Sequence, residues 1–308
     1  MTLSRLLTCS LCLTAVVASA EEYWASGIYQ SDGNYHGWYD VDKTGDDDGM
    51  CYAASAANLV AWWQFGRQNS GLSLPSGVPT APEDIWGKYK SACEKTDEGG
   101  VTVCAINWWL SGVYLPATPD EEARSVVGYD EENVDLITLK SFSGYYYDQY
   151  SLTEDDLGDF FKMYALDPED EEEKELYAGV FADLLTNGAG VSLGLSSDKG
   201  ELAHAVTLWG AEYDDVTGVL SMIWLTDSDD NNHQLFSVDV NVDEDANKIY
   251  FKDPEKVGYG YYEGVYIDQV RAILPSVAEA WGIPEPNAAT LAALMSLVGV
   301  ATRRRRRK

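Results

Sequence analysis

Basic residues are scarce in this sequence. Its 308 residues hold 21 lysines and arginines against 51 aspartates and glutamates, a formal net charge of −30. The extreme C-terminus, Arg303–Lys308, is wholly basic, so the rest of the chain is more acidic still. A strongly negative surface repels phosphate groups, and we therefore expect neither nucleic acid nor anionic membranes as partners. Acidic clusters such as Asp46–Asp48 are expected to be solvated loops.

Cysteines are few, and their spacing does not suit a metal. Beyond the first 20 residues the sequence has Cys51, Cys93 and Cys104, with no CxxC pair. This pattern excludes a structural zinc site of the usual kind. Cys93 and Cys104 are near enough in sequence to close a small disulfide loop in an exported protein. Cys51 is then left over, and an odd cysteine in an exported chain is a candidate reactive thiol.

Both ends of the chain are typical of targeting segments. Residues 1–20 contain an apolar run that ends in Val-Ala-Ser-Ala, which predicts a signal peptide cleaved after Ala20. A short membrane anchor and a lipoprotein leader are the alternatives. At the other end, Pro284-Glu285-Pro286 precedes an apolar run, Ala288–Ala301, and the basic cluster. As a helix that run would span about 20 Å, which is short for a stable bilayer crossing.

The C-terminal tail, residues 284–308, resembles a PEP-CTERM sorting signal. The resemblance implies transient membrane anchoring and an exosortase-type processing enzyme as a partner. An ordinary tail anchor is the alternative. Between the two ends, residues 21–283 are long enough to bury the core of one large domain. We therefore expect an exported protein, secreted or held at the cell surface or in the periplasm.

A run of small and apolar residues follows Cys51 and predicts a buried helix that ends near Phe65-Gly66. Alanine is the best helix former, and nothing in Tyr52–Trp63 breaks a helix. Gly49 permits a tight turn into this helix. Cys51 then lies in the first turn, where the helix dipole favours a thiolate, the form that acts as a nucleophile. A buried structural cysteine is the alternative.

The rest of the domain reads as helices followed by strands. Helical spacing of Ile85, Trp86 and Tyr89 predicts a helix at Pro82–Glu94. Capping and stop signals predict helices at Ser151–Tyr164 and Glu171–Thr186. Val101–Tyr114 fits either a helix or a strand. Apolar runs bounded by turn residues predict strands at Gly190–Ser196, His204–Tyr213, Val219–Thr226, Lys248–Phe251 and Tyr261–Ile273. We expect an α+β fold with the nucleophile helix in an N-terminal helical part and a C-terminal antiparallel sheet.

Histidine is rarer than cysteine, so the candidate bases are only His36, His204 and His233. A cysteine nucleophile needs a base within hydrogen-bond reach. His204 lies 153 positions after Cys51, close to the separation of about 130–150 in papain-like enzymes. His36 and His233 stand in polar turns and are expected at the surface. The alternative for His204 is a satisfied histidine in a sheet.

Hairpin geometry provides a partner for His204. If Asp214–Gly218 is the turn, His204 faces about Asp227–Ser228 on the next strand. A carboxylate there would fix the tautomer of the imidazole, which is the role of the third member of a triad. Asp229 is a rival or an auxiliary. The run from Asp227 also resembles a calcium loop, but it lacks the glycine and glutamate of an EF-hand, so we expect no metal.

The residues around these positions resemble the IdeS/Mac family of immunoglobulin-degrading cysteine endopeptidases. The matching residues are Gly37-Trp38-Tyr39-Asp40, Lys43-Thr44, Cys51 with Ala53-Ala54 and Asn58, Trp62-Trp63, His204 with Leu208–Ala211, and Thr226–Asp229. The resemblance implies a papain-like fold in which Cys51 is the nucleophile, His204 the base and Asp227 the orienting carboxylate. It also implies that Lys43 helps to bind the oxyanion and that Asp229 is a second supporting carboxylate.

We therefore expect a secreted cysteine endopeptidase that acts on protein substrates, immunoglobulin-like proteins among them. It needs neither a metal nor an organic cofactor. One alternative is transglutaminase-like acyl transfer to an amine by the same three residues. The other is a non-catalytic extracellular binding module that uses aromatic-rich segments such as Tyr145–Tyr147.

Overall fold

The protein is described by a computed structural model that covers residues 20–92, 102–111, 144–146, 161–165, 179–229, 232–243 and 248–273. The predicted signal peptide, apart from residue 20, and the predicted sorting tail lie outside these residues. Among the described residues, no helix combines the length and apolarity needed to cross a membrane.

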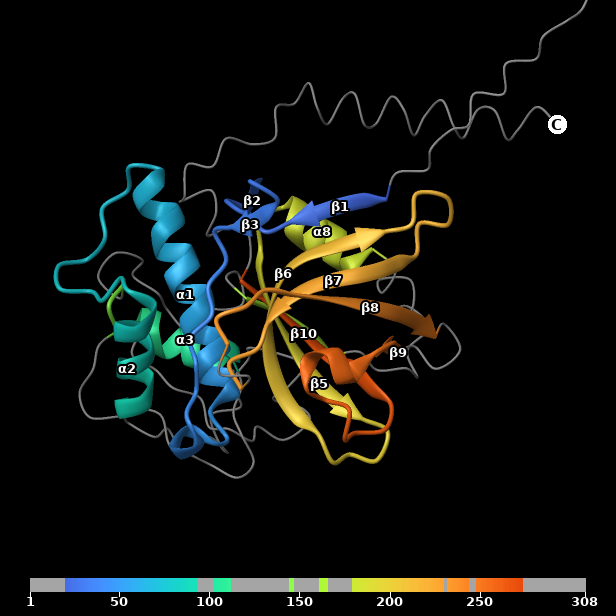
Figure 1. Cartoon of the computed structure of the whole chain (residues 1–308). Helices are drawn as coiled ribbons and strands as arrows, with labels where there is room; N and C mark the ends of the chain where they lie inside the picture. Colours follow the sequence, from blue (N-terminus) through green and yellow to red (C-terminus); the bar gives the residue numbers. More distant parts are fainter. Residues whose placement is uncertain are drawn as a thin grey trace, which may run out of the picture.

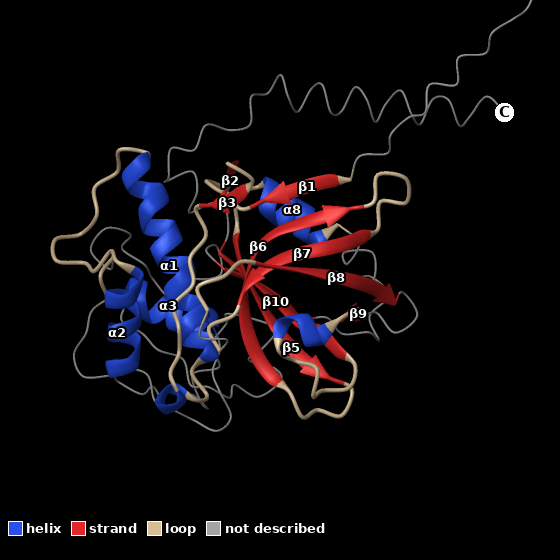
Figure 2. Ribbon diagram, viewed as in Figure 1, coloured by secondary structure: helices blue, strands red, loops and turns tan. Residues whose placement is uncertain are grey.

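Helices gather on one side of the molecule and strands on the other (Figures 1 and 2). The helical side consists of α1 (Cys51–Asn69), α2 (Pro82–Ala92) and α3 (Thr102–Ser111). A further helix, α8 (Val180–Thr186), packs against the strand side near β1. This arrangement confirms the predicted α+β class.

The strands form an eight-stranded antiparallel sheet with the order β1-β6-β5-β10-β9-β8-β7, and β6 also pairs with β7. That last pairing closes β5 to β10 into a barrel. The strands are β5 (Gly190–Ser197), β6 (Ala203–Tyr213), β7 (Leu220–Thr226), β8 (Phe236–Asp243), β9 (Lys248–Phe251) and β10 (Val265–Ile273). Outside the barrel, β1 (Glu21–Trp24) pairs with β6 and β4 (Phe161–Ala165) with β10. A separate hairpin is made of β2 (Tyr29–Ser31) and β3 (Asn34–His36).

Helix α1 packs against α2 and α3 on the helical side and against β5 and β6 of the barrel. It is buried on nearly all sides from Cys51 to Gln64, as the alanine-rich run predicted, although it continues through Gly66 to Asn69. Gly190 on β5 lies directly under Trp62, where a Cβ atom would come within 2.6 Å of the indole ring. A larger residue at 190 would therefore push the helix away from the barrel.

A buried polar network fixes α1 against the strands. The Ser55 hydroxyl shares hydrogen bonds of 3.0 Å with the hydroxyls of Thr207 on β6 and Ser192 on β5. Asn58 Oδ1 accepts the backbone N–H of Val41 at 2.9 Å. Buried polar groups stay paired because an unpaired one is costly, so this network specifies a single placement of helix, strand and N-terminal segment.

Two of the predicted helices need correction. Ser151–Tyr164 is wrong at its end, because Phe161–Tyr164 belong to β4, which is held by pairing with β10. The helix predicted from Glu171 is confirmed as α8 only from Val180, where Gly179 is the N-cap residue, and it ends at Asn187-Gly188 as predicted. Residues 151–160 and 171–178 lie outside the described residues. The undecided Val101–Tyr114 segment contains the helix α3.

Candidate active site

The thiol of Cys51 lies at the start of α1, as predicted. Met50 is the N-cap residue, and Gly49 makes the turn into the helix at a φ of 77°. Cys51 is a buried free thiol, not a disulfide partner. The positive end of the helix dipole favours an anion here, so this position stabilises a thiolate.

Cys104 shows what a purely structural cysteine looks like in the same fold. It is a free thiol in α3; Cys93, the disulfide partner considered for it, lies outside the described residues. Burial raises the pKa of the Cys104 thiol to about 12, against a smaller opposing effect of Arg271. Such a thiol stays protonated and inert at neutral pH.

A capped turn holds the loop between Lys43 and Cys51. The backbone N–H and the hydroxyl of Thr44 both donate to Asp47 Oδ2, at 3.2 and 3.0 Å. Lys90 Nζ lies 3.6 Å from the same oxygen. Asp47 is buried, so the expectation of a solvated loop is wrong at this residue, whereas Asp48 is exposed as expected. The Asp47 carboxylate caps the short 3₁₀ helix η1 (Gly45–Asp47).

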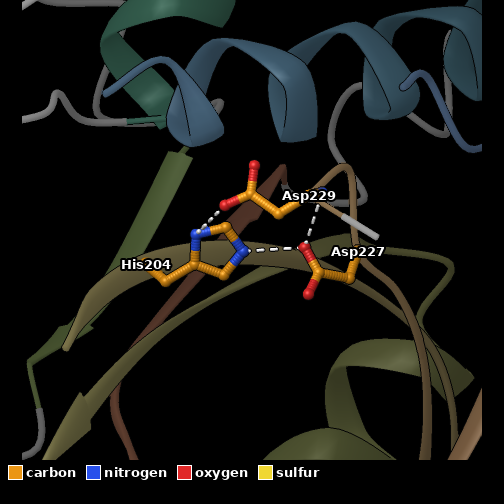
Figure 3. A group of neighbouring side chains, drawn as sticks. All are labelled: His204, Asp227 and Asp229. Carbon is orange, nitrogen blue, oxygen red and sulfur yellow. Dashed lines mark hydrogen bonds and ion pairs between the residues drawn. The ribbon is translucent and has the colours of Figure 1, made fainter. Parts of the chain in front are cut away.

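His204, near the start of β6, places its ring between two carboxylates (Figure 3). Nε2 lies 2.8 Å from Asp227 Oδ1, and Nδ1 lies 3.4 Å from Asp229 Oδ2. The Cys51 thiol interacts with the same ring, which lowers the pKa of the thiol and raises the pKa of His204.

Asp227 follows the last residue of β7 and is buried. Besides His204, its Oδ1 accepts the backbone N–H of Asp229 at 3.0 Å. Its Oδ2 accepts the hydroxyl of Tyr259, a residue that the sequence analysis did not select. Tyr259 comes from a loop far along the chain, and no local motif marks it. Asp229 Oδ2 lies near the other ring nitrogen, so the two carboxylates do not compete for the same nitrogen.

The hairpin between His204 and Asp227 has the predicted turn but a shifted register. The Asp214 backbone N–H donates to Val219 O at 2.9 Å, so the two strands begin to pair around a shorter turn than we assumed. The ladder ends with Thr207 opposite Thr226. Asp227 therefore reaches His204 from beyond the last strand pair, where its backbone is free of the ladder.

Lys43 brings a buried ammonium group to the same place. Its Nζ lies 2.5 Å from Asp229 Oδ1, and its backbone N–H donates to Ser228 O at 2.8 Å. The side chain of Asp229 is 45% exposed, so this cluster borders solvent. The structure thus brings together every residue that the sequence analysis selected as catalytic: Cys51, His204, Asp227, Lys43 and Asp229.

The two other histidines lie elsewhere, at the surface, as predicted. His36 is exposed on β3 and stacks on Tyr29 with ring centroids 5.3 Å apart. His233 is exposed too; its Nδ1 lies 2.9 Å from Asp40 O, and its ring packs on Trp38. Each has a structural contact and no acidic triad partner among those contacts.

The electrostatics of the site favour a thiolate paired with an imidazolium. Burial raises the pKa of the Cys51 thiol, but the hydrogen bond and charge of His204, the charge of Lys43 and the Ala205 backbone N–H bring it below its usual value. Burial lowers the pKa of His204, but the charge and hydrogen bond of Asp227, with those of Cys51, raise it well above its usual value. The thiolate–imidazolium pair is therefore the favoured form over the pH range that lies between the lowered pKa of Cys51 and the raised pKa of His204.

Alkylation of Cys51 should consequently stay fast at pH 6. A free cysteine with a pKa of about 8.5 would be almost wholly protonated there and would react slowly. Iodoacetamide labelling followed by peptide mass spectrometry, as a function of pH, measures this directly. Cys104 is the internal control, because its raised pKa and burial leave it unlabelled in the folded protein. Labelling of Cys51 only above pH 8 would contradict the thiolate assignment.

The carboxylates beside His204 do not form a convergent metal site. One ligand atom each from His204, Asp227 and Asp229 lies within 4.8 Å of the others. However, Asp227 and Asp229 address different nitrogens of one ring, so they bracket the imidazole (Figure 3). A metal ligand set needs its donors to point to one common centre.

Two comparisons with known proteins bear on this site. The family model described as Mac 1 matches residues 131–262, a range that includes His204, Asp227, Asp229 and Tyr259 but neither Cys51 nor Lys43. A protein named IgM protease, from Streptococcus suis (strain P1/7), is 25% identical over 240 residues. That match covers 68% of this chain but only 19% of the relative, so the chain spans a small part of the relative's length. Together the two matches confirm the resemblance of this chain to the IdeS/Mac family.

Proposed function

We propose that this protein is a cysteine endopeptidase that hydrolyses peptide bonds of protein substrates. The observation that carries the proposal is the buried thiol of Cys51 at a helix N-terminus, with a pKa lowered by His204, whose Nε2 lies 2.8 Å from Asp227 Oδ1. A nucleophile, a base and an orienting group in this order are the general signature of covalent catalysis. The nucleophile helix packed against an antiparallel barrel that carries the histidine supports a papain-like fold.

The reaction follows from the roles of these groups. The Cys51 thiolate attacks the peptide carbonyl carbon, and the C=O electrons move onto the oxygen. The C–N bond then breaks as His204, the imidazolium, protonates the leaving amine, which leaves a thioester on Cys51. Neutral His204 next takes a proton from water, whose oxygen attacks the thioester; the acid product leaves and the thiolate and imidazolium are restored.

Two groups are placed to stabilise the negative oxygen of each tetrahedral intermediate. The first N–H groups of a helix have no partner within the helix, so the Cys51 backbone N–H is one donor. Lys43 is the other. Its ammonium has three N–H donors, and the 2.5 Å contact with Asp229 uses one of them. Asp229 thus holds the ammonium in place without consuming its capacity to donate.

The test is a search for new chain ends. The purified protein is incubated with a panel of folded proteins that includes immunoglobulins, because the matched relative is named an IgM protease. We expect new N-termini on at least one protein, found by N-terminal labelling and mass spectrometry, and none with Cys51→Ser. Incorporation of a labelled amine without new N-termini would replace the proposal with acyl transfer. Substrate binding without either product would leave a binding module.

Export is proposed on the sequence pattern alone. In this proposal, residues 1–20 are a signal peptide, and residues 284–308 are a sorting tail that anchors the chain transiently until an exosortase-type enzyme removes it. The mature protein then ends near Pro284. Terminal peptide mass spectrometry of protein from its native host checks this, and an intact Arg303–Lys308 tail in a stable membrane fraction would favour an ordinary tail anchor.

A further inference from the structure

Tyr259 is a buried tyrosine whose position is set by its own loop. It follows a 3₁₀ helix, η3 (Pro254–Val257), and Gly258, which turns the chain with a φ of 83°. The Tyr259 backbone N–H donates to Pro254 O at 2.9 Å, and its carbonyl accepts the N–H of Tyr262 at 3.0 Å. Only glycine adopts such a φ without strain. The loop therefore holds the tyrosine before any substrate arrives.

The side chain of Tyr259 touches two members of the proposed triad. Its hydroxyl donates to Oδ2 of Asp227, the oxygen that His204 does not use. Its ring lies edge-on to the imidazole of His204, with centroids 5.8 Å apart and planes at 62°. With the backbone N–H of Asp229 on Oδ1, both oxygens of Asp227 have a fixed donor. A carboxylate held at both oxygens cannot rotate away from the imidazole.

We propose that Tyr259 is a positioning residue of the active site: its hydroxyl holds Asp227 in the orientation that serves His204, and its ring shields the pair from water. This inference rests on the proposed function, because it extends the chain Cys51–His204–Asp227 by a fourth member. Tyr259 does not contact the reacting atoms in this role. It acts through Asp227.

The charges around Asp227 give this role a measurable consequence. Burial raises the pKa of Asp227, while the charge and hydrogen bond of His204, the Tyr259 hydroxyl and the Asp229 N–H lower it below its usual value. Around that pair stand the thiolate of Cys51, the carboxylate of Asp229 and the ammonium of Lys43. Burial, with the charge of Asp227, raises the pKa of Tyr259 well above its usual value, so the hydroxyl remains a donor throughout the working range.

Removing the Tyr259 hydroxyl should therefore shift the pH dependence of the rate of Cys51 alkylation. In Tyr259→Phe the pKa of Asp227 rises, because one of the groups that lowered it is gone. As the pH falls, Asp227 is then protonated earlier, the imidazolium loses its counter-charge, and the thiolate is lost. The acid limb of the rate of Cys51 alkylation should move to higher pH. Turnover should fall by about tenfold to a hundredfold, the scale of one hydrogen bond to a charged group, with KM little changed.

Tyr213→Phe is the matched control. Tyr213 is 6% exposed, as Tyr259 is, and its oxygen accepts the backbone N–H of Ala182 at 3.2 Å. It stands at the far end of β6 from His204. Both variants lose one buried hydroxyl, so both should melt at a lower temperature. Only Tyr259→Phe should move the alkylation profile and lower kcat.

The alkylation assay needs no substrate, so it separates this inference from the proposed function. If the wild-type protein cleaves nothing, a shifted limb in Tyr259→Phe still supports the positioning role. A Tyr259→Phe variant that melts like Tyr213→Phe but keeps the wild-type limb and turnover would overturn it. If Tyr259→Phe does not fold, 3-fluorotyrosine at position 259 is the second variant, because it keeps the packing and is a stronger hydrogen-bond donor. It should move the acid limb of the Cys51 alkylation rate to lower pH. An unchanged acid limb would overturn the inference.

Discussion

Replacing His204 with alanine should abolish turnover while leaving the fold intact. His204 is the acid that protonates the leaving amine and the base that activates water, so both halves of the proposed reaction lose their proton carrier. Removal of the histidine from a catalytic triad typically costs about 10⁶-fold in kcat. The helix α1 is held by the hydrogen bond between Ser55 and Thr207, which does not depend on His204. Circular dichroism and thermal melting should therefore show a folded protein.

The same variant should slow the alkylation of Cys51 at pH 6. Among the groups that lower the pKa of Cys51, His204 contributes most, both by its hydrogen bond and by its charge. Without it, burial raises the pKa of the thiol and the thiolate fraction at pH 6 falls. Loss of turnover with alkylation still fast at pH 6 would mean that another group activates the thiol.

The other two histidines provide the controls. His36→Ala and His233→Ala remove surface contacts with Tyr29 and with Trp38 and Asp40, and both should keep turnover near the wild-type rate. Surface substitutions of this kind usually change the free energy of unfolding by less than about 0.5 kcal/mol. If either variant were inactive while His204→Ala remained active, the base would be misassigned and the triad with it.

The sequence predicted the position of Cys51 well because the signals for it are local. The alanine-rich run after Cys51 and the glycine before it determine a buried helix with a cysteine in its first turn. The hairpin arithmetic also brought Asp227 to His204, although the true pairing is shifted. The shifted register does not change this pairing of side chains, because Asp227 lies just past the last strand pair and its side chain reaches the ring of His204.

What the sequence could not give depends on contacts between distant segments. Barrel closure through the β5–β10 pairing joins strands far apart in the sequence and has no local signature. The strand β4 was mistaken for the end of a helix, because pairing with β10 outweighs a capping pattern. Tyr259 was missed for the same reason, because its distinguishing contacts are with Asp227 and His204, which lie far from it in the sequence.

Lys43→Ala is the second large effect that we expect, with a fall in kcat of about 10²–10³-fold, which is typical for the loss of one oxyanion donor. KM should change little, because an ammonium placed where negative charge develops interacts more strongly with the transition state than with the substrate. The buried position of Lys43 near Cys51 supports this role, since the charge of Lys43 already lowers the pKa of the thiol. Alkylation of Cys51 at pH 6 should therefore slow only modestly, and steady-state kinetics together with the alkylation rate measure both effects.

A purely structural role for Lys43 makes a different prediction. In that case its only task is to hold Asp229, and Asp229→Asn should reproduce the whole effect of Lys43→Ala. If the ammonium acts on the oxyanion, Asp229→Asn should cost far less, because the lysine remains, and the double variant should resemble Lys43→Ala alone. Lys90→Ala is the control for charge near this loop: Lys90 also pairs with an acidic residue, Asp47, but it is half-exposed, and such pairs are worth under about 1 kcal/mol. A near-wild-type kcat in Lys43→Ala would contradict the oxyanion role of Lys43. A group other than Lys43 would then have to bind the oxyanion together with the Cys51 backbone N–H.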